Sequence, residues 1–332
     1  MLYPLKFQPI FKERIWGGRN LERLYGKALP PGVPIGESWE ISDRPGDVSV
    51  IANGPLAGHD LHWLVQHRGR ELLGEASLQG NRFPLLIKLL DAQEKLSLQV
   101  HPPASQAATL GGEPKTEMWF IADAAQDAEL FVGLKRGITR EIFQQKMEAG
   151  TVADCFHRIH VKAGDTMFLP SGRVHAIGAG LVLFEIQQNS DTTYRVFDWN
   201  RVGLDGKPRE LHVAESLASI DFDDFEPALT VGKLTRGPNF SAQRLVNDPL
   251  FTVDRFDVET QDSILWRRPT LRIIGLVKGS IAVASRAGDP VDLKAGEFCL
   301  LPASLNAVEL AAQPGTCFLH VEVGRASSQP ER

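Results

Sequence analysis

The chain has 332 residues, a net charge of -5 at pH 7 and a pI near 6.0, with ordinary apolar and charged fractions for a globular protein. This mild acidity gives no electrostatic reason to bind nucleic acid or an anionic membrane, and no apolar run is long enough to span a bilayer. Residues 1–7 do not resemble the start of a signal peptide, and the three cysteines form no Cys-x-x-Cys pair, so we expect a cytoplasmic protein with reduced thiols.

Short apolar segments punctuated by glycine and proline run through the chain and are typical of β-strands. The clearest of them lie at residues 83–90, 95–101, 118–121, 166–170, 181–186 and 194–199. Helical periodicity is confined to residues 61–72, to a segment that Thr139 can cap and Gly150 can end, and more weakly to residues 211–219. The pattern predicts an all-β fold of sandwich or barrel type with a few short helices, and not alternating βαβ units.

An internal repeat indicates a duplicated architecture. Residues 161–165 (VKAGD), followed by 168–170 (FLP), recur as 293–297 (LKAGE), followed by 300–302 (LLP), at an offset of 132 residues. This signature resembles the second motif of cupins, which implies two cupin-type jelly-roll β-barrels. We place a catalytic barrel with N-terminal strands and helices at residues 1–235, and a second cupin-like barrel at residues 236–332.

The two copies of the repeat differ at one position, where only the first copy has a residue that can bind metal. His175 follows the first copy, whereas Ala307 stands at the matching position after the second. If His175 is a ligand, the second barrel lacks metal ligands and is structural.

One segment, residues 95–103, carries polar side chains on one face of a predicted strand. Because successive side chains of a strand point to opposite faces, Ser97, Gln99 and His101 lie on the same face. Polar side chains on a buried face need hydrogen-bond partners or a ligand. Zinc is bound by imidazole nitrogen and carboxylate oxygen, so His101, Glu117 and His175 are candidate ligands, with Gln99 as a neutral oxygen donor. Taken singly, a histidine on a strand is more often a hydrogen-bonded core or surface residue than a metal ligand, and Glu117 could be the solvated start of a strand.

Several motifs together resemble one family, the class I (type I) mannose-6-phosphate isomerases, in their short bacterial form. The motifs, which cover residues 1 to about 200, are Gln99–Pro102, Lys115–Trp119, Gly172–Gly178 and Glu185–Trp199, with Trp16–Gly18 and Gly36–Glu40 before them. The resemblance implies an enzyme that interconverts mannose 6-phosphate and fructose 6-phosphate through a cis-enediol. It also implies one Zn²⁺ per chain, held by Gln99, His101, Glu117 and His175.

The resemblance also implies roles for residues near these ligands. Arg195 falls at the position of a catalytic arginine, whose fixed charge suits an enediolate oxygen. Ser97 and Arg201 match positions that contact the substrate phosphate.

Two further residues are candidates from their own surroundings. Lys115 should face the same side as Glu117 and is a candidate for acid/base chemistry. Glu185 is a carboxylate in an otherwise apolar strand and therefore needs a partner, which favours substrate orientation or proton relay. By residue type alone, Lys115 would be a solvated strand-edge lysine and Arg195 a surface arginine.

Two other functions remain open at this stage. The first is another metal cupin enzyme, such as an iron oxygenase with similar ligands. The second is a non-catalytic cupin that binds a sugar phosphate and has no use for Lys115 or Arg195. The expected partner is a small-molecule sugar phosphate, with no nucleic acid and no membrane, and the expected chain is a monomer or a weak homo-oligomer.

Overall fold

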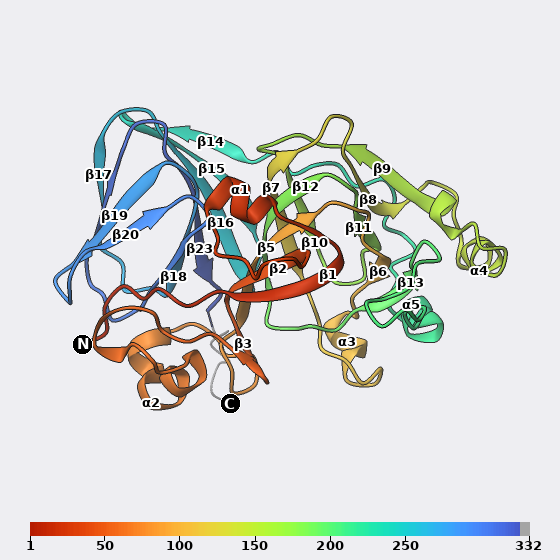
Figure 1. The fold of residues 1–332 in the computed structure, drawn as a ribbon, viewed down its shortest axis with the longest axis horizontal. Helices are drawn as coiled ribbons and strands as arrows, with labels where there is room; N and C mark the ends of the chain where they lie inside the picture. The colour runs from red at the N-terminus through yellow and green to blue at the C-terminus, as the bar shows by residue number, and fades with distance from the viewer. Residues whose placement is uncertain (326–332) are drawn as a thin grey trace, which may run out of the picture.

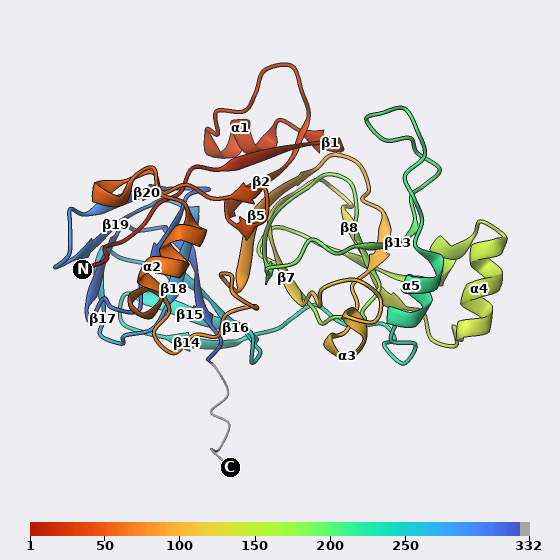
Figure 2. The same cartoon turned by 90° about the horizontal axis from the view of Figure 1, so that it is seen from below.

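The computed structural model describes residues 1–325 and contains two β-rich halves that lie side by side along the long axis of the molecule (Figures 1 and 2). Every pairing between the named strands is antiparallel. The predicted fold class, β-dominated and of cupin type with a few short helices, is confirmed.

The first half consists of two sheets. In spatial order, the six-stranded sheet is β1 (Ile10–Gly18), β2 (Ile35–Ile41), β5 (Leu85–Ala92), β12 (Leu181–Gln188), β7 (Glu117–Ala124) and β10 (Thr166–Leu169). The five-stranded sheet is β13 (Tyr194–Phe197), β6 (Leu98–Val100), β11 (His175–Ile177), β8 (Glu129–Leu134) and β9 (Phe156–His160). A separate ribbon joins β3 (Asp43–Arg44) to β4 (Asp47–Val48).

The second half repeats this plan. Its six-stranded sheet is β14 (Lys233–Arg236), β15 (Phe240–Asn247), β16 (Phe251–Val258), β23 (Cys317–Val323), β18 (Arg272–Lys278) and β21 (Phe298–Leu301). Its four-stranded sheet is β17 (Asp262–Trp266), β22 (Val308–Ala312), β19 (Ser280–Ser285) and β20 (Val291–Lys294). The two strand orders correspond element by element, except that β13 has no counterpart.

The sequence repeat forms the same turn in both halves. Gly164 and Gly296 have φ values of 94° and 79°, a left-handed conformation that glycine adopts without steric cost. In each copy the next residue, Asp165 or Glu297, accepts a hydrogen bond from the backbone N–H three residues earlier, at 2.9 and 2.8 Å. This turn leads into β10 in one half and β21 in the other, which explains why the motif recurs as a unit.

Helices are few and short, as the sequence predicts. They are α1 (Asn20–Tyr25), α2 (Leu61–Leu73), α3 (Ala104–Ala107), α4 (Arg140–Glu148) and α5 (Val213–Ser219), with 3-10 turns η1 (Gly54–Leu56) and η2 (Val152–Cys155). The side chain of Thr139 caps α4 by accepting from the N–H of Ile142. The sequence did not reveal α1 and α3, because helices of six and four residues are too short to show a periodicity.

The two large sheets share one hydrophobic core. Leu89 and Phe184 of the first sheet and Ile273 and Val321 of the second belong to a single cluster of buried side chains. The opposite faces of the same sheets line two further cores, one inside each half. Strand β5 is buried on both faces, which explains why residues 85–90 read as a nearly continuous apolar run.

The N-terminal residues also contact the second half. Leu5 pairs with Leu300, and the backbone N–H of Ala303 donates to the carbonyl of Leu72 in α2. All strands up to β13 belong to sheets of the first half, and all strands from β14 onwards belong to sheets of the second half. The proposed division between residues 235 and 236 stays a prediction.

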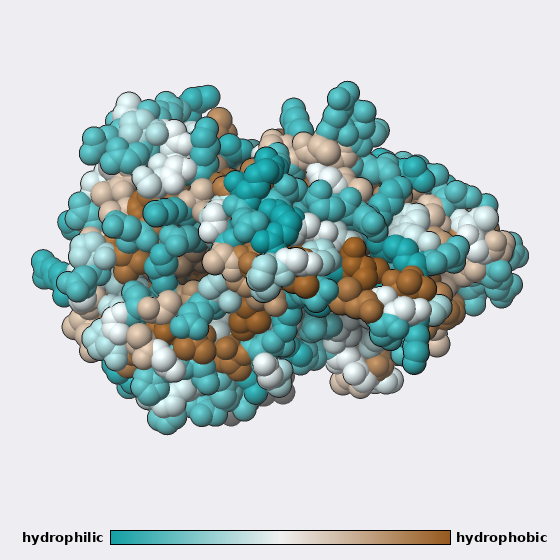
Figure 3. All heavy atoms as spheres, viewed as in Figure 1, coloured by the Kyte–Doolittle hydropathy of each residue, from teal (hydrophilic) through white to brown (hydrophobic). Residues whose placement is uncertain are grey.

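The exterior is mainly hydrophilic on the face shown in Figure 3, with apolar side chains gathered towards the middle. Within residues 1–325, no helix combines the length and the apolar character needed to cross a membrane.

Candidate active site

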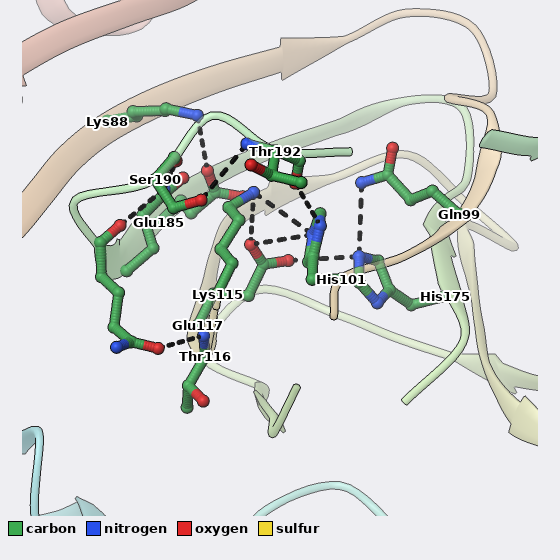
Figure 4. A network of polar contacts seen from close by, with 12 residues as sticks. Lys88, Gln99, His101, Lys115, Thr116, Glu117, His175, Glu185, Ser190 and Thr192 are labelled. Carbon is green, nitrogen blue, oxygen red and sulfur yellow. Dashed lines mark hydrogen bonds and ion pairs between the residues drawn. The ribbon is translucent and has the colours of Figure 1, made fainter. Parts of the chain in front are cut away.

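A cavity of about 560 Å³ opens into the first half. Its walls come from strands far apart in sequence, and several of the predicted site residues line it, namely Ser97, Gln99, Lys115, Glu185 and Arg195. The three candidate metal ligands lie directly beside these residues (Figure 4).

The candidate ligands His101, Glu117 and His175 converge although the last lies 74 positions after the first in the sequence. One candidate ligand atom of each lies within 4.8 Å of the others. The Nε2 atoms of His101 and His175 lie 3.5 and 3.3 Å from the two oxygens of Glu117. These separations match the roughly 3.4 Å between neighbouring donors around a tetrahedral zinc with bonds of about 2.1 Å.

Backbone carbonyls fix the orientation of both imidazoles. The Nδ1 atom of His101 lies 2.8 Å from the carbonyl of Thr192, and that of His175 lies 2.9 Å from the carbonyl of Arg173. A carbonyl can only accept, so each Nδ1 carries the proton and each Nε2 presents its lone pair to the site. Such outer hydrogen bonds are the usual means of fixing a metal-binding histidine.

Burial and charge also prepare the three groups for a cation. Their side chains are at most 1% exposed, and the buried carboxylate of Glu117 forms an ion pair with Lys115 at 2.7 Å. Burial and Lys115 lower the pKa of His101 to about 4, and burial lowers the pKa of His175, so both rings are neutral at pH 7. Burial alone would raise the pKa of Glu117, but Lys115 and His101 hold it well below its usual range. A buried anion between two neutral imidazoles is a donor set that suits a divalent metal.

Gln99 lies beside this group. It pairs with His175 between β6 and β11, its Nε2 is 3.3 Å from the Nε2 of His175, and its Oε1 accepts from Ser97. Ligation through Oε1 therefore needs the amide to turn by 180°, which places the oxygen where Nε2 now lies.

The two predicted acid/base residues have the partners that their positions require. Lys115 is 5% exposed, and its Nζ lies 2.7 Å from Glu117 and 3.3 Å from the Nε2 of His101. Glu185 accepts from the indole N–H of Trp119 at 2.8 Å and pairs with Lys88 at 3.1 Å. Its carboxylate is therefore held in place at the cavity wall.

Lys88 and Glu37 are site residues that sequence reasoning missed. Both are buried, both line the cavity, and the Nζ of Lys88 lies 3.8 Å from a Glu37 oxygen. Burial would lower the pKa of Lys88, but Glu185 and Glu37 raise it, so the ammonium form persists. Burial opposes ionisation of Glu37, yet Lys88 and Arg14 lower its pKa to about 2. The sequence did contain one indication of the role of Lys88, namely a lysine within the apolar run of residues 83–90.

Arg195 is anchored on β13, opposite Gln99 of β6. Its Nη1 donates to the carbonyl of Glu210 at 2.7 Å, whereas its buried Nε has no hydrogen-bond partner among residues 1–325. Burial and the neighbouring Arg209 lower the pKa of Arg195 from its ordinary value. The guanidinium of Arg195 is therefore held at the cavity and can donate a further hydrogen bond to a substrate oxygen.

Arg201 and Arg209 share the carboxylate of Asp198. Arg209 donates to it at 2.5 and 2.6 Å, and Arg201 donates to it at 2.8 Å. Arg209 lines the cavity, whereas Arg201 lies outside the lining residues and pairs also with Glu94 at 3.6 Å. The sequence singled out Arg201 and missed Arg209, because the loop of residues 198–212 returns to the site only in three dimensions.

Comparison with known proteins places this geometry in context. Residues 4–145 match the family model of the type I phosphomannose isomerase catalytic domain. The chain is 37% identical over 310 residues to the mannose-6-phosphate isomerase ManA of Bacillus subtilis, covering 92% of this chain and 95% of that protein. It is 42% identical over 321 residues to the probable mannose-6-phosphate isomerase GmuF of the same organism, covering 96% and 98%.

A solved structure agrees with these relatives. The crystal structure of the mannose 6-phosphate isomerase from Bacillus subtilis superimposes with a TM-score of 0.87 at 32% identity, covering 97% of this chain and 99% of that one.

Proposed function

Because this chain belongs to the type I phosphomannose isomerase family, we propose that it interconverts mannose 6-phosphate and fructose 6-phosphate through a cis-enediol, with one zinc ion per chain. One observation carries the proposal. A buried His–Glu–His group, whose carboxylate pairs with Lys115, lies beside a cavity whose lining includes two lysines and three arginines. This combination suits an anionic substrate whose oxygens gain charge during the reaction.

The donor set favours zinc held by His101, Glu117 and His175, with Gln99 as a fourth donor. Two neutral nitrogens and a carboxylate would leave room for substrate once Gln99 gives way or the ion takes a fifth ligand, as catalytic zinc does. When bound, the ion supplies Lewis-acid polarisation of substrate oxygens. The same donors would accept other divalent metals, and the choice of zinc is part of the proposal.

The reaction requires a proton to move between two carbons. Conversion of the aldose to the ketose removes a proton from C2 and returns one to C1, while the hydroxyl proton of O2 is lost and O1 gains one. We assign the transfer at carbon to the Nζ of Lys115, which lines the cavity beside the ligands: as the neutral amine it takes the proton from C2, and as the resulting ammonium it returns one to C1. We assign orientation of the sugar hydroxyls, and relay of their protons, to Glu185, held by Lys88 and Trp119.

Two positive side chains have separate tasks in this proposal. Arg195 stabilises the enediolate oxygen, because its guanidinium is fixed at Glu210 and keeps donors to spare. Arg209 binds the phosphate in a bidentate way, with Ser97 and Arg201 as further substrate-binding residues. Asp198 positions both Arg201 and Arg209.

Two single variants distinguish the roles of Arg201 and Arg209, the two arginines that pair with Asp198. We expect Arg209→Gln to raise the KM for mannose 6-phosphate about tenfold or more, as for loss of one charge-assisted hydrogen bond, with kcat little changed. Arg201→Gln also removes one guanidinium that pairs with the Asp198 carboxylate. It should raise KM less, because Arg201 does not line the cavity. Steady-state kinetics of both variants measure this, and the reverse order would assign the phosphate to Arg201.

The isomerase assignment is tested with the purified, metal-loaded protein. Fructose 6-phosphate should form from mannose 6-phosphate in a coupled assay, and in D₂O the product should acquire deuterium at C1 over many turnovers. A product free of deuterium would contradict the enediol route. Consumption of oxygen would support an oxygenase instead, and binding without turnover would support a non-catalytic sugar-phosphate cupin.

A further inference from the structure

The second half contains a cavity at the position that corresponds to the metal site of the first. In the first half, Glu117 of β7 pairs with Leu169 of β10. In the second half, Arg272 of β18 pairs with Leu301 of β21, and these two leucines are separated by the repeat offset of 132 residues. Arg272 therefore occupies the place of the ligand carboxylate.

The other ligand positions have also changed chemical character. Ala307 replaces His175, and Trp266 of β17 pairs with Val308, which brings the next residue, Arg267, opposite Ala307. Arg267 thus corresponds to Gln99, which faces His175 in the first half. A cation-binding arrangement has been replaced by one rich in positive charge.

The cavity itself measures about 370 Å³. Its lining includes Trp266, Arg267, Arg268, Arg272, His320 and Glu322. Three guanidinium groups face one carboxylate, so the cavity carries a net positive charge even with His320 neutral. Such a cleft concentrates anions.

Arg272 provides the strongest indication of a ligand. It is 2% exposed, and its only hydrogen bonds run from Nε and Nη2 to the carbonyls of Thr270 and Arg268, at 3.3 and 2.7 Å. Within residues 1–325 no carboxylate forms an ion pair with it, and its Nη1 has no acceptor. Glu322, its neighbour on β23, and the Trp266 ring, 5.2 Å from the guanidinium carbon, stabilise this charge without a direct ion pair. A buried charge without a direct partner is costly, which favours an anion beside it.

His320 adds a ring nitrogen without a hydrogen-bond partner among the described residues to the same cavity. Its side chain is 8% exposed, and this nitrogen, Nε2, is itself buried. The carboxylates near it are Asp254, 3.6 Å from Nδ1, and Glu322, 3.8 Å from Nε2. Trp266, 4.3 Å from the imidazole between ring centroids, closes one side of the group.

We propose that this second cavity is a binding site for a phosphoryl anion, with Arg272 as its buried anchor and Arg267 and Arg268 at its entrance. Guanidinium groups match the oxygens of a phosphomonoester, and the volume admits either inorganic phosphate or a small phosphorylated sugar. The site is separate from the catalytic cavity, since no residue lines both.

Calorimetric titration of the full-length, metal-loaded protein tests the proposal, first with inorganic phosphate and separately with mannose 6-phosphate. We expect wild type to bind mannose 6-phosphate at two sites per chain. The double variant Arg267→Gln/Arg268→Gln should keep one site and bind phosphate at the second cavity about tenfold or more weakly. Loss with both titrants assigns the site to phosphate itself, whereas loss with the sugar phosphate alone assigns it to a phosphorylated sugar.

Two further variants distinguish loss of anion binding from a change in folding. Arg286→Gln removes one positive charge from an exposed position of the same half and should leave both sites intact. Arg272→Met removes the anchor and should reduce the rise in Tm that phosphate produces in wild type to the part contributed by the catalytic cavity, without lowering the Tm measured in the absence of phosphate. A single site in wild type, or a second site that survives both the double variant and Arg272→Met, would overturn the proposal.

Discussion

Replacement of His175 by alanine is expected to remove the bound metal and to lower activity by about 10³-fold or more, since a Lewis acid contributes several kcal/mol of charge stabilisation. The variant leaves the carboxylate of Glu117 with one imidazole in place of two, so the site loses a neutral donor that no described neighbour replaces. Metal content measured by atomic emission spectrometry, together with the coupled assay, gives both results.

The fold should survive this change. His175 is the first residue of β11 and contributes to the sheet through its backbone pairing with Val132 and Gln99. Circular dichroism should therefore match wild type. His160→Ala, at an exposed position on β9 in the same half, is the matched control and should retain metal and activity. Stoichiometric metal in the His175 variant would refute the ligand assignment.

Replacement of Arg195 by alanine is expected to lower kcat by roughly 10²-fold or more while the metal content stays intact, as for the loss of one oxyanion donor. The reason is that the guanidinium interacts most strongly when the enediolate carries negative charge, and only such an interaction raises the rate. KM should change less than kcat, because we assign phosphate binding to Arg209 at another part of the cavity.

Lysine at position 195 should restore only part of the rate. An ammonium supplies the charge, but it lacks the planar fork that allows Arg195 to donate to the Glu210 carbonyl and to substrate together. Steady-state kinetics of the alanine and lysine variants, with Arg209→Gln as a variant expected to affect KM, separate catalysis from binding. A normal kcat with a raised KM in the alanine variant would make Arg195 a binding residue and contradict the proposed mechanism.

The duplication gives a physical reason for the difference between the two halves. The same strand order and the same turn recur, because the repeat specifies backbone conformation through Gly164 and Gly296. The residues that fill the two cavities are not constrained by that turn. One half therefore carries a His–Glu–His group where the other carries Arg272, and under our proposals a single architecture serves one site for a cation and one for an anion.

The sequence by itself determined the β-rich class, the duplication and the residues that form the candidate metal group. These features depend on local rules, namely strand alternation around residues 97–101, the glycine turn of the repeat, and the motifs that resemble the isomerase family. Each rule acts within a few residues, so it can be read without knowing how the strands pair.

Only the tertiary structure decided which charged groups share the cavity. Lys88 and Glu185 meet because β5 and β12 are neighbours in the sheet, and they are 97 residues apart in sequence. Arg209 reaches the site through a loop whose local sequence does not indicate a position in space. Sheet pairing and loop closure are set by burial of apolar surface over the whole chain, so the partners of a buried charge follow from the complete fold and not from the residues beside it.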